Sequence, residues 1–138
     1  MADTGQGATL TLATTGAVGV IRSMTLPEFA IDKIETSDLS TTGFKTYIAT
    51  DLAEPGELTA EIIFDAEDDD VPSFGVSETV TVTWPIHTTG NTTNATLAGT
   101  GFITNFKLPD MQIGELQVAT ITVAFDGLTD PAFTAEAA

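Results

Sequence analysis

The sequence predicts an all-β domain: a β-sandwich or distorted barrel of two packed antiparallel sheets, with at most one short helix. The first observation is that threonine is abundant and that apolar residues mostly alternate with polar ones, which is the pattern of half-buried strands. The second is that no long segment shows helical periodicity. The third is the length of 138 residues, which suits a single domain spanning 1–138.

Three segments alternate most clearly, and each is expected to bury one face. Their other faces carry threonines or carboxylates, so these segments predict strands that line the core on one side. The residues expected to share a core face are Val80, Val82 and Trp84 in the first, Leu58, Ala60, Ile62 and Phe64 in the second, and Ala119, Ile121, Val123 and Phe125 in the third.

Weaker alternation predicts four more strands, over residues 8–12, 18–26, 29–36 and 98–107. In the last of these, the pattern places Ala98, Thr100, Phe102, Thr104 and Phe106 on one side. Gly99 and Gly101 then lie on the other side, which indicates a bend or a closely approaching backbone.

The segment Ser37–Pro55 is predicted to be a long loop, and loops of that length are usually functional or disordered. Its aromatic and aliphatic residues favour a docking role over disorder. Asp65–Gly75 is the best candidate for a short helix, with Pro72 limiting its length. The small, polar ends, 1–7 and 129–138, are expected to be flexible.

The charge balance is strongly acidic. Twenty acidic residues face four basic ones, so the formal net charge is −16. Affinity for nucleic acid and for anionic membranes comes mainly from Lys and Arg, so specific binding to either is not expected. Only 17% of residues are charged and 42% are hydrophobic, which predicts that part of the surface meets protein instead of water.

Cysteine is absent, so neither disulfides nor thiolate metal sites are available. Met1–Thr4 lacks the basic start and apolar run of a signal peptide, and no stretch approaches about 18 apolar residues. The product is therefore expected in the cytoplasm when it is made, with no membrane partner.

The inventory of chemically active residues argues against an enzyme. The one histidine, His87, has no neighbour resembling a triad or a zinc pair, and is interpreted as a strand-end residue. The acidic run Asp65–Asp70 lacks the glycine and terminal glutamate of an EF-hand loop, so it is interpreted as a solvated loop or helix start. Trp84 fits core packing better than a sugar platform. No catalytic residue, cofactor or metal site is predicted.

Several motifs follow one another in the order of a known family. They are Ile34–Ser40, Glu54–Thr59 with its Pro-Gly-Glu, the strand end Ile62–Asp65, and Ile121–Gly127 as a closing strand. Together they resemble the tail tube (major tail) protein of long-tailed bacteriophages, a tail-tube-like fold.

That resemblance implies a structural protein of the virion tail, assembled in the host cytoplasm, whose hexameric rings stack into a hollow tube. Strands of six subunits would form a continuous barrel, and the long loop would pack against the adjacent ring. The implied partners are further copies of the chain, the tape measure protein, and terminator and baseplate proteins. DNA would pass through during ejection without specific binding. The inter-ring candidates in this chain are Ser37, Asp38, Leu39, Phe44, Tyr47 and Ile48.

A lumen rich in carboxylates would repel DNA phosphates and let the genome slide. Glu57, Glu61 and Asp65 alternate with core residues and are the lumen-facing candidates.

Two alternatives fit the same residues. One is a surface-exposed β-sandwich binding module, stabilised by calcium at residues 67–70. The other is a different virion protein, such as a capsid decoration or tail completion subunit.

Overall fold

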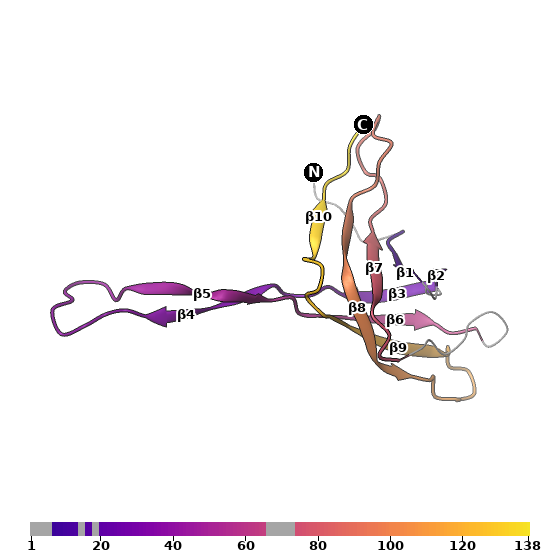
Figure 1. Cartoon of the computed structure of the whole chain (residues 1–138). Coiled ribbons are helices and arrows are strands. Elements are labelled where there is room, and N and C mark those ends of the chain that lie inside the picture. The colour runs from indigo at the N-terminus through magenta and orange to yellow at the C-terminus, as the bar shows by residue number, and fades with distance from the viewer. Residues whose placement is uncertain (1–6, 14–15, 18–19, 66–73) are drawn as a thin grey trace.

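The computed structural model describes residues 7–13, 16–17, 20–65 and 74–138, and this part of the chain is built from β-strands alone, as predicted (Figure 1). The predicted helix Asp65–Gly75 falls mainly outside the described residues. The strands are β1 (Thr9–Leu12), β2 (Gly16–Ala17), β3 (Val20–Thr25), β4 (Ala30–Glu35), β5 (Tyr47–Glu54), β6 (Glu57–Ile63), β7 (Glu78–Thr83), β8 (Thr96–Lys107), β9 (Val118–Phe125) and β10 (Ala132–Thr134).

All strand pairs are antiparallel, and eight strands form one sheet in the order β2-β1-β7-β8-β9-β6-β3, with β10 added to β8. The long strand β8 joins two layers. Its first half pairs with β7 and β10, and its second half pairs with β9. In Figure 1, β7 and β10 run up the page while β3, β6 and β9 run across it, so the layers cross.

The core lies between these two layers. The period-two residues of β6, β7 and β9 point into it, and Trp84 and Phe64 pack against its margin, as the sequence predicts. Burial of aliphatic side chains is the main stabilising contribution here, at roughly 25 cal/mol per Å² of apolar surface. The buried residues are Leu10, Leu12, Leu58, Ala60, Ile62, Val80, Val82, Leu97, Ile103, Ala119, Ile121, Val123 and Phe125.

Strand β8 corrects one sequence expectation. Its register shifts between Ile103 and Asn105, so Phe106 packs against the core while Phe102 lies on the opposite face beside Ala124. The two phenylalanines therefore do not share a side, because the bulge reverses the alternation. The expected close approach is confirmed at Gly101, where a Cβ would lie 2.6 Å from the carbonyl oxygen of Ala124.

The predicted loop Ser37–Pro55 is wrong in its second half, which is strand β5. Strands β4 and β5 form a separate two-stranded hairpin that projects from the body (Figure 1), and we call it, with its connecting turn 36–46, the arm. Neither strand contacts any other strand in the described part of the chain.

The arm joins the body at Gly56. This residue has a φ of 79°, and a Cβ on it would lie 2.6 Å from the carbonyl oxygen of Glu28. The Gly56 carbonyl accepts a hydrogen bond of 3.2 Å from the Phe125 amide. Glycine is required here for two reasons: the backbone is in the left-handed region, and the segment entering the arm at Glu28 packs closely against the segment leaving it at Gly56.

The C-terminal segment, expected to be flexible, is paired with the body instead. Strand β10 lies along β8, and the backbone of Ala137 bonds that of Thr93 in both directions at 2.9 and 3.0 Å. The Glu136 carboxylate accepts hydrogen bonds from the His87 and Thr88 amides at 3.1 and 3.0 Å, and from the Asn91 side chain at 3.0 Å. This carboxylate clamps the C-terminus to the turn after β7.

The Glu136 clamp is expected to open in acid. Hydrogen bonds from Thr88, His87 and Asn91 lower the pKa of Glu136 from 4.5 to about 2. Because the folded-state pKa lies below the unfolded value, the stabilisation is present above about pH 4.5 and is lost as the pH falls toward 2. The single tryptophan, Trp84, reports this event because its ring contacts that of Phe133 in β10 edge-on, with centroids 5.5 Å apart.

The measurement is Trp84 fluorescence from pH 7 to pH 2 in the native chain and in Glu136→Gln. The native emission should shift to the red over the acidic interval, while the variant should be red-shifted at pH 7 and change less. Superimposable titration curves would show that Glu136 does not hold β10.

Candidate assembly surfaces

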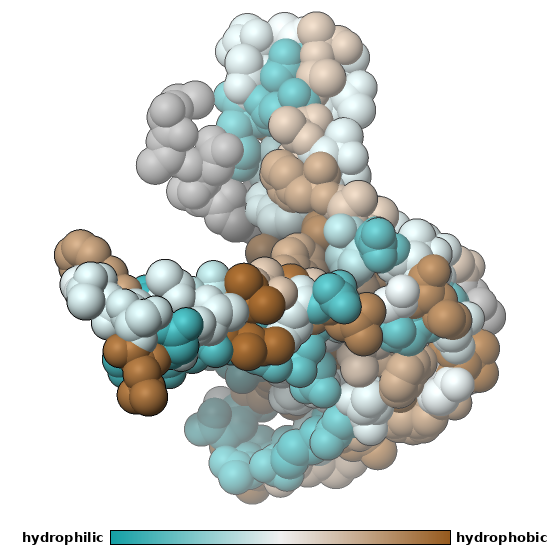
Figure 2. Space-filling model, turned by 60° about the vertical axis from the view of Figure 1, so that its left-hand side comes forward, coloured by the Kyte–Doolittle hydropathy of each residue, from teal (hydrophilic) through white to brown (hydrophobic). Residues whose placement is uncertain are grey.

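The arm exposes apolar side chains on both of its faces. Every residue of β4 is exposed, and seven of the eight residues of β5 are exposed. Figure 2 shows apolar residues gathered on the arm, at the left of the view. The large apolar residues at least 40% exposed on the arm are Ile31, Ile34, Leu39, Phe44, Tyr47, Ile48 and Leu52.

The turn at the arm tip is held by its own polar side chains. The Asp38 carboxylate accepts hydrogen bonds from the Ser40 amide at 2.9 Å, the Ser40 hydroxyl at 2.6 Å and the Thr41 hydroxyl at 3.3 Å. The Ser40 hydroxyl, with these other donors, lowers the pKa of Asp38. The amide of Thr46 donates to the Ser37 hydroxyl at 2.8 Å, which closes the turn. Leu39 and Phe44 are therefore displayed on a pre-organised turn.

The structure thus brings the predicted inter-ring residues together. Ser37, Asp38, Leu39 and Phe44 lie in the tip, while Tyr47 and Ile48 begin β5 next to it. The Lys33 ammonium lies 4.3 Å from the Tyr47 ring centroid, in cation–π contact.

Exposed as it is, the arm lacks the contacts that normally stabilise a hairpin. An isolated two-stranded hairpin is marginally stable in water, and a contiguous exposed apolar surface usually marks an interaction site. Burying a large apolar side chain contributes about 1.5–3 kcal/mol. If a partner covers four of the seven exposed apolar residues of the arm, the gain is on the order of 6–12 kcal/mol. Association costs about 4–15 kcal/mol, so a single arm contact is marginal and several in parallel are needed.

The second candidate surface is the layer made by β3, β6, β9 and the second half of β8. Within the described residues, β3 has a strand partner only at β6, and β8 beyond Gly101 has one only at β9. Both edges of this layer therefore lack a strand partner among the described residues, although at the β8 edge the Ile103 carbonyl accepts one hydrogen bond, from the Gly75 amide at 3.4 Å. Open edges present unpaired amide and carbonyl groups, which can pair with another chain.

The face of this layer that points away from the core is polar in its middle, between an apolar pair at one end (Ile63 with Val118) and another near the other end (Phe102 with Ala124). It carries Glu57, Thr59 and Glu61 of β6 and Thr120 and Thr122 of β9, while their neighbours in sequence point inward. The Ser23 hydroxyl of β3 donates to the Glu61 carboxylate at 3.3 Å. Asp65 follows β6 and is exposed. Two of the three lumen candidates, Glu57 and Glu61, thus lie on the outer face of β6, and the third, Asp65, comes shortly after the strand.

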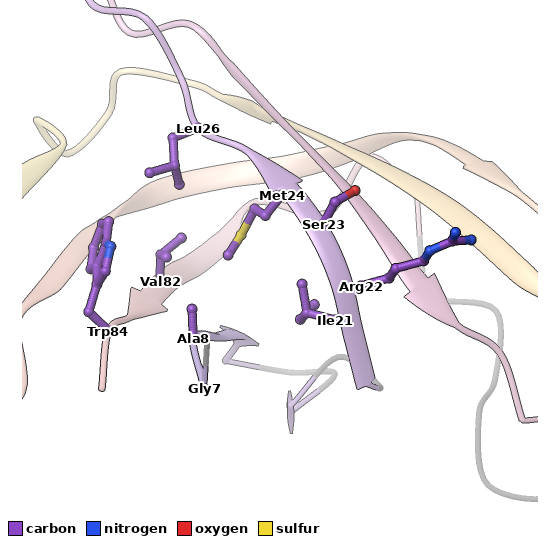
Figure 3. A pocket seen from close by; sticks show the side chains of 9 residues that line it. All are labelled: Gly7, Ala8, Ile21, Arg22, Ser23, Met24, Leu26, Val82 and Trp84. Atoms are coloured by element: carbon purple, nitrogen blue, oxygen red, sulfur yellow. The ribbon is translucent and has the colours of Figure 1, made fainter. Parts of the chain in front are cut away.

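A cavity of about 480 Å³ lies where β3 approaches β1 and β7 without pairing. Five large apolar residues line it: Ile21, Met24, Leu26, Val82 and Trp84 point toward one another in Figure 3, while the Arg22 side chain points away. The cavity is a gap at the margin of the core. Its lining residues include no acid and base pair that could act in catalysis.

The loop between β8 and β9, residues 108–117, is a surface that the sequence analysis missed. Its exposed fractions are 53% at Leu108, 87% at Met111, 105% at Ile113 and 58% at Leu116. Four large apolar residues within nine positions, without strand or helix periodicity, were the available signal.

Metal and histidine chemistry find little support in the part of the chain that the structure describes. There, no group of three His, Asp or Glu side chains is close enough to hold a metal ion. Residues 67–70, the calcium candidate, lie outside the described residues. His87 lies in the loop four residues beyond the end of β7 at Thr83, not at the strand end as expected, and its Nε2 is buried without a hydrogen-bond partner. Across the same described residues, no helix has the length and hydrophobicity needed to span a membrane.

Comparison by sequence gives no match, either to a protein-family model or to a curated protein. Comparison by structure does. A chain in the cryo-EM structure of an extracellular contractile injection system, the PVC sheath/tube terminator in its extended state, matches with a TM-score of 0.72 at 12% identity, covering 98% of both chains.

Two further solved structures are similar. A chain of the PVC sheath-tube complex in its extended state gives a TM-score of 0.65 at 13% identity, covering 93% of this chain and 88% of that one. A chain of the anti-feeding prophage baseplate gives 0.65 at 10% identity, covering 98% of both. The all-β, tail-tube-like fold class predicted from sequence is therefore confirmed along almost the whole chain.

Proposed function

We propose that this chain is a structural, non-catalytic subunit of a tail tube, in which hexameric rings stack around an acidic lumen. The observation that carries the proposal is the four-stranded layer whose two edges, β3 on one side and the second half of β8 on the other, have no strand partner within the described residues. In a ring, each edge pairs with the opposite edge of a neighbour, so every edge is satisfied.

The carboxylates and threonines on the outer face of the layer support an orientation of that face toward the lumen. Glu57 and Glu61 stand on the outer face of β6, and Asp65 follows it. Six chains of net charge −16 give a ring of roughly −96, a strongly repulsive field for DNA. On this proposal DNA slides through without specific contacts during ejection, and the tube belongs to a virion tail assembled in the host cytoplasm.

The partners follow from the same geometry. Further copies occupy the edges and the arm, a tape measure protein fills the lumen before ejection, and terminator and baseplate proteins cover the two ends. Similarity to chains in tube, terminator and baseplate assemblies supports the tube, terminator and baseplate partners.

Negative-stain electron microscopy of the purified chain over a range of salt concentrations tests the proposal. Rings or tubes are expected, with longer tubes at high salt, because the screening length falls from about 10 Å at 0.1 M to about 3 Å at 1 M. A monomer at every salt concentration and at high protein concentration would contradict the tube. Tubes whose length is independent of salt would contradict the charge argument alone.

A second candidate role is a terminator that caps the tube. The observation favouring it is the match to a chain of the sheath/tube terminator assembly, with a TM-score of 0.72 over 98% of both chains. The same micrographs separate the two roles, because a terminator forms single rings that do not stack.

A further inference from the structure

Resting on the proposed function, we propose that the arm tip of one subunit seats on the β8–β9 loop of the next copy along the tube, with Lys45 against Glu115. The arm and this loop project from opposite ends of the molecule in Figure 1. When subunits stack head to tail, these are the two ends that meet.

The two surfaces match in chemistry. Leu39 is 108% exposed and Phe44 is 93% exposed at the arm tip, against 87% for Met111 and 105% for Ile113 in the loop. A contact between two different surfaces generates an open, extending polymer, whereas arm-to-arm contact around a two-fold axis would close as a dimer. The pair therefore fits a tube.

Charge selects the same pairing. At the arm, Asp38 is satisfied within the tip and Lys33 contacts Tyr47, so Lys45 is the cation left for a partner among the described residues. In the loop, Asp110 already pairs with Lys107 at 3.3 Å, which leaves Glu115 as the available anion.

The loop also offers a place for the lysine side chain. A hollow of about 200 Å³ lies between the β8 end and the β9 start, with Glu115, Leu116 and the Lys107–Asp110 ion pair in its wall, so that Glu115 is its one carboxylate without an ion-pair partner among the described residues. An ammonium entering it meets a carboxylate, and its aliphatic stem meets an apolar side chain.

Charge reversal in purified protein at 0.1 M salt tests the seat. Lys45→Glu and Glu115→Lys each place like charges together and are expected to weaken each contact by about fivefold. The effect multiplies across a ring, so tubes should shorten to single rings. The combined Lys45→Glu, Glu115→Lys variant restores opposite charges and should elongate again. Asp130→Lys, in the β9–β10 turn, makes the same charge change as Glu115→Lys away from both surfaces and should elongate like the native chain.

Cross-linking gives an independent readout, because the native chain has no cysteine. Thr42→Cys in one preparation and Gln112→Cys in another should form disulfide-linked dimers when mixed under oxidising conditions, and neither should do so alone. The proposed contact between the arm tip and the β8–β9 loop would be overturned by any of three results. These are single charge variants that elongate normally, a double variant that stays short, and tubes without the mixed cross-link. Native protein that forms neither rings nor tubes would overturn the proposed function instead.

Discussion

Removing the arm is expected to abolish tube assembly while leaving the subunit folded. In the variant, residues 31–53 are replaced by Asn-Gly between Ala30 and Glu54. Those two residues face each other in the β4–β5 register, so a two-residue turn can close the shortened hairpin. No residue of β4 or β5 belongs to the core, so thermal unfolding should change little. Stacking of rings into tubes should be lost, because the exposed apolar surface that offsets the cost of association between rings is gone.

Sedimentation velocity and electron microscopy measure the assembly, and circular dichroism measures the fold. Single rings without stacked tubes are the sharpest expected result, since the open sheet edges remain. Full-length tubes from the armless chain would contradict the assigned role of the arm. Loss of the folded β signal would show that the arm supports the body.

Leu58→Ala is expected to cause the largest loss of stability from a single substitution. Leu58 has no exposed surface and lies in β6, between β3 and β9. Removing a buried leucine side chain leaves a cavity and typically costs about 2–5 kcal/mol. Small domains are stable by about 5–15 kcal/mol, so the variant should unfold at clearly lower urea concentration.

Leu52→Ala is the matched control, with the same chemical change in the arm. Leu52 is 83% exposed, so its truncation should leave the monomer's urea midpoint nearly unchanged and reduce assembly instead. The two leucines separate folding from association. Equal loss of stability in both variants would show that the arm is part of the folding unit.

The sequence predicts the core strands well because one physical rule governs them. In β6 and β9 every second residue is buried between the two layers, so alternation is visible in the letters alone. Strand β5 was missed because its faces are not distinguished by burial within the subunit. The bulge after Ile103 was missed for a related reason: register depends on the neighbouring strand, not on local sequence.

The candidate assembly residues were likewise predictable from local sequence, whereas their position in space was not. Leu39 and Phe44 stand out because an apolar residue in a polar, glycine-containing loop has no local use. Their position at the end of a projecting hairpin was not predictable, because it depends on the pairing of β4 with β5. Met111 and Ile113 carry the same signal and were overlooked beside the clearer strands on either side.

The joint at Gly56 makes the arm a lever. At about 3.3 Å per residue, the ten positions from Ala30 to Leu39 reach roughly 30 Å from the body. A rotation of about 10° at the joint would therefore displace the tip by about 5 Å, the width of one side chain at that strand spacing. Gly56 has no Cβ, which lets its backbone pack against the Glu28 carbonyl. This close packing fixes the direction in which the arm leaves the body. If copies stack through their arms as proposed, the precision of stacking is set at Gly56, far from the contact itself.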